Sequence, residues 1–407
     1  MNGVAGGNDD GMSLRNPLLP LYAGRVLRSV SQGYLAIVVP LYLLSLGYSA
    51  TAVGLLIAIG SGSGALLTLA VGALADRVGR KPILAAFGIL TALAGVVFAV
   101  QGNFIVLAIA GALGTIGQGG GVGSGGAFGP YFVAEQALTA ELAGDERRTA
   151  VFARLSLVGT VGSIFGAGLA VFPARPLFWL TAAIGIALAL VVLPIKEQRT
   201  RAVRARSKAS LAPSTWKLIR RFMLTNATNG LAIGFLGPIL VLWFHERFHV
   251  NADQIAVLYT TINLLSILSY LGVTRIVAAI GGAVRTVVAL RVFSCALLAV
   301  MPFAPSFAFA GAIYALRMLV NIVTFPVRQS YAMGIIPASE RSRASALSNL
   351  PARVGSMGGP LVAGALIEHA WIGLPLEFAS ALQLLNAGLY WLFFRNLPPP
   401  EEVEAEV

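Results

Sequence analysis

Apolar segments of helix length recur along the whole chain. A helix needs roughly 20 mainly apolar residues to cross the hydrocarbon core of a bilayer, and it satisfies its own backbone hydrogen bonds there. Only 11% of the residues are charged, too few to cover a soluble surface. We therefore predict an all-α integral membrane protein with twelve transmembrane helices. The predicted spans are residues 20–46, 51–75, 82–101, 104–133, 149–171, 174–194, 218–244, 252–274, 285–303, 306–330, 344–368 and 372–395.

The distribution of basic residues predicts an orientation. The formal charge of +12 is spread between the apolar spans rather than gathered on one patch, which argues against nucleic-acid binding. Lysine and arginine concentrate in the loops after even-numbered spans, while the opposite loops hold little beyond Arg175 and Arg247. Because cytoplasmic loops carry an excess of these residues, we expect both termini in the cytoplasm of a multi-pass protein, in a bacterial inner membrane.

The chain divides into two related halves at its long polar interruption. The segment that begins at Gly33 resembles the one that begins at Gly230, and the segment from Glu146 resembles the one from Glu340. Internal duplication at half-chain length is typical of transporters that move two bundles about a central site. We predict a cytoplasmic tail at 1–17, a six-helix bundle at 18–195, a basic cytoplasmic linker at 196–217, a second six-helix bundle at 218–396 and an acidic tail at 397–407.

A short motif between the second and third spans points to a family. The sequence GALADRVGRK, from Gly72 to Lys81, resembles the signature of the major facilitator superfamily at the place where that family carries it. The resemblance implies the major facilitator fold, alternating access, and a conformational latch in which Asp76 pairs with arginine or caps a helix. In the second half Ala278 replaces the aspartate, so the latch would be one-sided. The predicted latch residues are Gly72, Asp76, Arg77, Gly79, Arg80 and Lys81.

The subfamily is not resolved by the motifs, which are loosely like those of twelve-helix drug and metabolite exporters. Thr115 occupies the place, before Gln118, of an arginine that the family links to proton coupling. The fifth span has a glycine ladder in which Ala167 replaces the proline of the drug/proton antiporters. The stretch 117–130 is rich in glycine, which either a helix break facing a cavity or close helix packing would explain.

Charged side chains inside a bilayer are costly and therefore mark functional candidates. Arg28, Arg317 and Arg353 lie deep in their predicted spans, whereas Arg25 and Arg154 are shallower and are expected to reach the headgroups. Arg317, Asn321, Thr324 and Arg328 form one helical stripe. The resemblance places helices one, four, seven and ten around the central cavity; structural arginines bonded to carbonyls remain the alternative. The predicted substrate-binding residues are Arg28, Gln32, Gln118, Asn226, Asn229, Arg317, Asn321 and Arg353.

Few carboxylates accompany these arginines, which favours an anionic substrate. Glu135 is the candidate for the group that carries a coupling proton. We predict a secondary active transporter, not an enzyme, that moves a small organic solute by proton-linked efflux; uptake of an organic anion by symport is the alternative. We expect a monomer among membrane lipids, with no cofactor and no nucleic-acid partner.

A second motif suggests functions of another class. Residues His245 to His249 read HExxH, the zinc-protease pattern, and His369 is the remaining histidine in the chain. The motif lies at the outer end of the seventh span, with no further ligand pattern after it. Solvated histidines, an outer metal or pH-sensitive site, a membrane metalloprotease and a non-transporting receptor are therefore the open alternatives.

Overall fold

The structure, a computed structural model, describes residues 18–114, 116, 129–195, 212–237, 239–337, 340–369 and 371–397. Within these ranges the chain is helical and has no strand, which confirms the predicted all-α class. Seven of its helical segments are, by length and composition, long and apolar enough to cross a membrane. The helices are α1 Leu19–Ser45, α2 Ala50–Val78, α3 Arg80–Val100, α4 Phe104–Gly114, α5 Gly129–Leu169, α6 Ala174–Val191, α7 Pro213–Gly234, α8 Ile239–Phe248, α9 Ala252–Ile280, α10 Ala283–Val300, α11 Phe307–Ile335, α12 Arg341–Glu368 and α13 Leu374–Phe394, with a 3₁₀ turn, Met301–Phe303, after α10.

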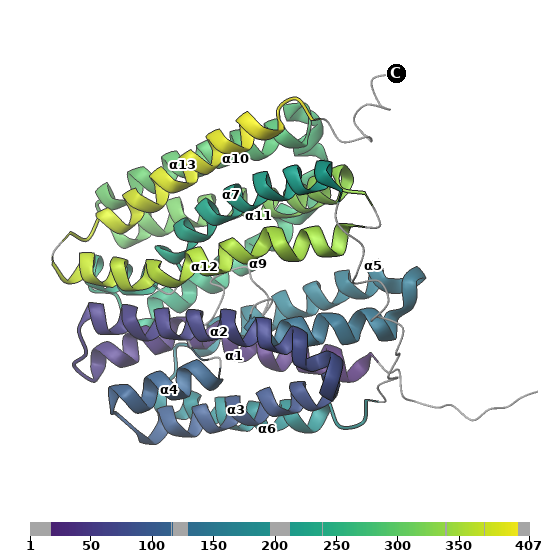
Figure 1. The fold of residues 1–407 in the computed structure, drawn as a ribbon. Coiled ribbons are helices and arrows are strands. Elements are labelled where there is room, and N and C mark those ends of the chain that lie inside the picture. Colours follow the sequence, from purple (N-terminus) through teal and green to yellow (C-terminus); the bar gives the residue numbers. More distant parts are fainter. Residues whose placement is uncertain are drawn as a thin grey trace, which may run out of the picture.

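The helix α5 accounts for parts of two predicted spans. The guanidinium of Arg28 in α1 lies over the ring of Tyr131, while a side chain at Gly162 would touch the neighbouring Ser29. In a straight α-helix, residues 131 and 162 would be about 47 Å apart. The helix must therefore reverse between them, and Figure 1 shows its two arms side by side. With α4, the first arm forms the fourth span, and the second arm forms the fifth.

The seventh predicted span is interrupted rather than continuous. The helix α7 ends at Gly234, and α8 begins at Ile239 after a turn that contains Gly237. A proline follows this glycine in the sequence, and proline cannot donate the backbone hydrogen bond that a continuing helix needs. Trp243 and Phe244 of α8 are fully buried in an aromatic cluster with Phe307 of α11.

The helices form two bundles that are related by a structural repeat. In Figure 1, α1 to α6 lie in the lower half of the molecule, and the later helices lie in the upper half. The repeat extends to single backbone angles: Gly79 precedes α3 with φ 104° and ψ 160°, and Gly282 precedes α10 with φ 103° and ψ 161°. Only glycine adopts such angles readily. The turn before the third helix of each bundle is therefore conserved between the halves. Because Gly79 corresponds to Gly282 and not to Gly281, the residue that matches Asp76 is Ala279 rather than Ala278, and the second half still lacks the aspartate.

In the part of the chain that the structure describes, the two bundles share a hydrophobic core at one end. We call the end where α1 begins and α13 ends the terminal end, and the opposite end the far end. The main hydrophobic core runs through the first bundle and continues at the far end into α8, the start of α9 and the close of α12. At the terminal end the second bundle has a separate core around Phe222 and Phe394. The bundles are thus joined by apolar packing at the far end.

The helices α2 and α12 make the closest approach between the bundles. A side chain at Gly54 would clash with the carbonyl of Pro360, and one at Gly364 would clash with that of Ala50. At the far end, the backbone nitrogen of Thr51 donates to a carboxylate oxygen of Glu368 at 2.9 Å. A carboxylate at the start of α2 also interacts favourably with the helix dipole.

Candidate functional site

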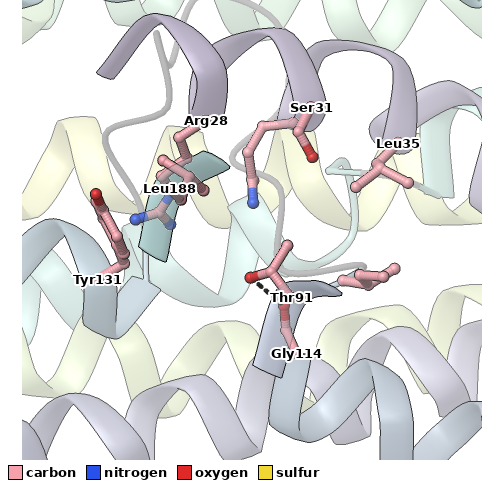
Figure 2. A pocket seen from close by; sticks show the side chains of 9 residues that line it. Arg28, Ser31, Leu35, Thr91, Gly114, Tyr131 and Leu188 are labelled. Carbon is pink, nitrogen blue, oxygen red and sulfur yellow. Dashed lines mark hydrogen bonds between the residues drawn. The ribbon is translucent and has the colours of Figure 1, made fainter. Parts of the chain in front are cut away.

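A small pocket opens inside the first bundle, beside the deep arginine of α1 (Figure 2). The guanidinium of Arg28 points towards the ring of Tyr131, 4.9 Å from its centroid. Across the pocket, the hydroxyl of Thr91 in α3 donates to the carbonyl of Gly114 at 3.2 Å. The pocket therefore combines a cation with hydroxyl and amide groups in an apolar wall, and its volume of about 10 Å³ is close to that of a single water site. It is lined by Arg28, Ser31, Gln32, Leu35, Thr91, Gly114, Ile116, Tyr131 and Leu188.

A buried ion pair lies next to this pocket. Arg25 of α1 and Glu135 of α5 are 2.8 Å apart, with side chains 4% and 1% exposed. Arg25 also lies over the ring of Phe132, 4.8 Å from its centroid. From its shallow position we expected Arg25 to reach the headgroups. In the structure it is buried and paired instead. The first arm of α5 places a carboxylate and an aromatic ring against it.

The first bundle keeps a net positive charge in this region. The carboxylate of Glu135 attracts Arg28 as well as Arg25, so two guanidinium groups surround one carboxylate. In an apolar interior such charges interact more strongly than they do in water. This arrangement can bind an anionic group, and it holds a carboxylate that can exchange its arginine partner for a proton.

A second polar site lies within the second bundle, around Arg291 at the middle of α10. Its guanidinium donates to the amide oxygen of Asn229 in α7 at 2.8 Å and to that of Asn386 in α13. The amide of Asn386 donates in turn to the hydroxyl of Thr228 at 2.9 Å. Three helices are therefore connected through one buried arginine, which is 4% exposed.

The predicted stripe on α11 faces this same interior. Arg317 is 4% exposed and donates to the amide oxygen of Gln383 in α13 at 3.4 Å. One turn along, Asn321 donates to the hydroxyl of Ser294 in α10 at 2.7 Å. These contacts direct Arg317 and Asn321 towards α13 and α10 of their own bundle.

The end of the stripe contacts α7. Arg328 donates to the amide oxygen of Asn226 at 2.9 Å, and Asn226 donates to the carbonyl of Ser348 in α12 at 2.9 Å. The predicted residues Asn226, Asn229, Arg317 and Asn321 therefore all lie in the polar interior of the second bundle. The hydrogen bonds divide them among three groups, with Asn229 beside Arg291, Asn321 beside Arg317 and Asn226 beside Arg328.

The remaining substrate-binding candidates lie elsewhere. Arg353 of α12 donates to the hydroxyl of Thr68 in α2 at 3.2 Å, so it contacts the other bundle rather than either polar site. Arg154 is exposed. Gln118 lies outside the described residues, as does most of the glycine-rich stretch 117–130, of which Gly129 and Pro130 begin α5.

Sequence reasoning missed Arg291, Tyr131 and the role of Arg25. A signal for Arg291 was present, because an arginine at the centre of an apolar span is itself a functional candidate. Tyr131 gave no such signal, since a tyrosine in a membrane helix is ordinary. Arg25 was judged by its depth alone, which says nothing of the helix packed against it.

Comparison with known proteins places the chain in a family. The family model described as the Major Facilitator Superfamily matches residues 21–223 and again 222–407. The chain belongs to the major facilitator superfamily. The repeated match agrees with the two bundles, and the fold is that of a twelve-helix major facilitator protein with two six-helix halves.

Individual members of the superfamily resemble the chain along nearly all of its length. The quinolone resistance protein NorA of Staphylococcus aureus (strain MSSA476) is 23% identical over 91% of this chain and 95% of its own. Among solved structures, a point mutant of the nucleoside transporter NupG gives a TM-score of 0.73 at 12% identity, covering 93% of this chain and all of its own. The human organic anion transporter MFSD10 gives 0.65 at 17% identity, with coverage of 93% and 100%.

Membership of the superfamily settles the class of function. Major facilitator proteins are multi-pass membrane transporters of small solutes, so this chain is a transporter and not an enzyme. The protease alternative is therefore wrong. Within the described residues no three metal-ligating side chains gather in one place. The ring of His245 contacts the carbonyl of Val250, and that of His369 contacts the carbonyl of Ala365.

The major facilitator motif lies at the terminal end of the first bundle. Arg80 at the start of α3 pairs with Glu141 of α5, and Lys81 donates to the carbonyl of Leu193 after α6. These contacts connect the start of α3 to two neighbouring helices. Gly79 has the positive φ described above, while the side chains of Asp76 and Arg77 lie outside the described part, as do the surroundings of Gly72.

Proposed function

We propose that this chain is a proton-linked secondary transporter of a small organic anion, and that it works by alternating access between its two bundles. The observation that carries the proposal is the group formed by Arg25, Arg28 and Glu135, where two cations surround one buried carboxylate. An anionic group of the solute would bind Arg28 at the pocket of Figure 2.

Glu135 would carry the coupling proton. When it is ionised, it neutralises Arg25 across 2.8 Å. When it is protonated, Arg25 loses its counter-charge, and the pocket becomes more attractive to an anion. Proton binding and anion binding would therefore depend on each other through one shared arginine.

The predicted orientation in the membrane suggests which conformational state of the transport cycle the structure represents. Basic residues gather in the loops at the terminal end, which favours a cytoplasmic location for that end. The apolar closure at the far end then corresponds to a shut outer gate. The structure would represent a state that exchanges solute with the cytoplasm.

Export is the first candidate for the direction of transport. It is favoured by the relative NorA, which is named for quinolone resistance and aligns with nearly the whole chain. A specific observation favours uptake by symport as the second candidate. Protonation of Glu135 would strengthen anion binding at Arg25 and Arg28, and a proton and an anion that bind together would be carried in the same direction.

Transport by the purified protein in proteoliposomes, under an imposed pH gradient, tests the proposal. Labelled organic anions, cations and neutral solutes are compared with the gradient in each direction. Anion transport in the direction opposite to proton flow supports export by exchange. Anion transport in the same direction as proton flow supports symport. Failure of every anion to respond, with transport of a cation or neutral solute, would contradict the proposed substrate class.

A variant isolates the coupling residue. Glu135→Gln should still exchange solute across the membrane without a gradient, but it should lose the response to pH. Glu377→Gln is the control, because Glu377 is an exposed carboxylate in the first turn of α13. A Glu135→Gln protein that accumulates solute with the wild-type pH response would contradict the proposed role.

A further inference from the structure

The core of the second bundle contains arginines without acidic partners. Arg291 lies at the middle of α10 and Arg317 near the middle of α11, and each is 4% exposed. The ion pairs found among the described residues, Arg25–Glu135 and Arg80–Glu141, are both in the first bundle. The sequences of α7, α10 and α11 contain no aspartate or glutamate, and α13 has only Glu377, in its first turn.

The charges of this core also repel one another. Arg291 lies close enough to Arg317 and Arg328 to experience their like charges. Three guanidinium groups therefore share a region that no acidic side chain of its helices neutralises. A buried charge is ordinarily paired, because an apolar medium does not solvate it as water does.

The amide partners of these arginines leave donor capacity unused. Asn229, Asn386 and Gln383 accept hydrogen bonds from Arg291 and Arg317. Each guanidinium has five N–H donors, and the buried Nε atoms of both arginines have no hydrogen-bond partner among the described residues. Amide oxygens satisfy single donors, but they carry no negative charge.

The repeat indicates that the fold does not require this cluster. Gly88 stands at the same distance from Gly79 as Arg291 does from Gly282, so the two positions correspond in α3 and α10. In the first bundle, a side chain at Gly88 would clash with the backbone of α6 near Gly185. Glycine packing joins the third and sixth helices there, while an arginine–amide network occupies the same place in the second bundle.

We propose that the core of the second bundle binds an anion, held by the guanidinium groups of Arg291 and Arg317 between α10, α11 and α13. The anion supplies the negative charge that the helices lack. Its chemistry is that of a compact acceptor for charged N–H donors, and the source is either chloride from solution or the acidic group of the transported solute. The anion site does not depend on the proposed proton coupling or on the direction of transport. The anion site can therefore be overturned while the proposed function stands, and the proposed function can be overturned while the anion site stands.

The first test measures anion binding by thermal stability. The purified full-length protein is unfolded in increasing sodium chloride, with sodium gluconate keeping the ionic strength constant. Binding to the folded state should raise the Tm in a saturable way, by about 2–5 °C at saturation. A Tm that does not respond to chloride or to any transported organic anion would overturn the proposal.

Variants locate the site. Arg291→Gln and Arg317→Gln should each lose the saturable shift. Arg221→Gln is the matched control, because Arg221 belongs to the same bundle but donates to the carbonyl of Phe393 near the terminal end. A shift that persists in both cluster variants would overturn the assignment. If either variant fails to fold, the bound anion is located in a crystal of the wild-type protein soaked in bromide. Anomalous density away from Arg291 and Arg317 would then overturn the assignment.

Competition separates the two sources of the anion. Bound radioactive chloride is measured on the wild-type protein while a transported organic anion is added. Displacement in proportion to the solute identifies the site as part of the solute pathway. Chloride that remains bound at saturating solute identifies a resident anion. Both outcomes uphold the site, whereas absence of bound chloride together with no Tm response to the solute overturns it.

Discussion

Arg25 and Glu135 form an ion pair that the first bundle buries, so each is the other's main source of charge compensation. Removing one partner of a buried pair leaves an uncompensated charge and costs about 3–5 kcal/mol. We expect Arg25→Gln and Glu135→Gln each to lower stability on this scale, and the double variant to recover much of the loss. Thermal unfolding in a double-mutant cycle measures the interaction.

An arginine at the surface is the control for this cycle. Arg175 is exposed at the start of α6, so Arg175→Gln should change the Tm little. Additive losses in the cycle would mean that Arg25 and Glu135 stabilise the bundle independently and that their proximity has no energetic role.

At the scale of single residues, the sequence predicts positions better than partners. The spacing of Arg317 and Asn321 identified one face of a helix, because helical geometry fixes which side chains are neighbours. The same spacing could not show that this face meets Ser294 and Gln383. The partners of these side chains on other helices depend on how the helices pack, and the spacing of residues along one helix carries no information about that packing.

Among the helices, α3 and α6 are held together by glycine. A side chain at Gly185 would clash with the backbone of α3 at Ala92. We expect Gly185→Leu to separate the two helices and to destabilise the first bundle by about 1–3 kcal/mol or more. Gly388→Leu is the matched control, since Gly388 in α13 is exposed with open space around it. Equal Tm values for the two variants would show that the close contact does not contribute to stability.

The helices α2 and α12 lead to a different expectation for Arg353. Its contact with Thr68 lies between the bundles and away from both polar sites. We expect Arg353→Gln to change the rate of transport, because it alters the interface that must open, while the affinity for solute stays within about twofold. Initial rates over a range of solute concentrations separate the two effects, and a rise in KM with an unchanged maximal rate would instead place Arg353 in the solute site.

Helix boundaries show what composition predicts and what it does not. The apolar lengths located the helices to within a few residues, because the bilayer sets the length of a span. The reversal of α5 joins two predicted spans through a helical connection. The break between α7 and α8 occurs at a Gly-Pro step, which the sequence contained and which a length argument overlooked.

Across the whole molecule, the shared core at the far end predicts a pattern of accessibility. The chain has a single cysteine, Cys295, so Cys295→Ser gives a cysteine-free background. Ala50 is buried where α2 meets Gly364 of α12. An Ala50→Cys protein should react slowly with a membrane-impermeant thiol reagent, and faster when transport opens the far end.

The control position lies at the same end of the molecule. Glu377 is exposed at the start of α13, so Glu377→Cys should react rapidly in every condition. Labelling is measured by mass spectrometry before and after solute is added. If Ala50→Cys reacts as fast as Glu377→Cys without solute, the far end is open in the resting protein.

The uneven distribution of buried arginine between the bundles would also make the second bundle respond to the membrane potential. A unit charge that crosses the whole field of a 100 mV membrane potential changes in energy by about 2.3 kcal/mol. Three guanidinium groups that move through a tenth of that field would contribute roughly 0.7 kcal/mol, about a threefold change in the balance between two conformations. A bound anion would cancel part of this charge, so an empty and a filled second bundle would respond differently to the same potential.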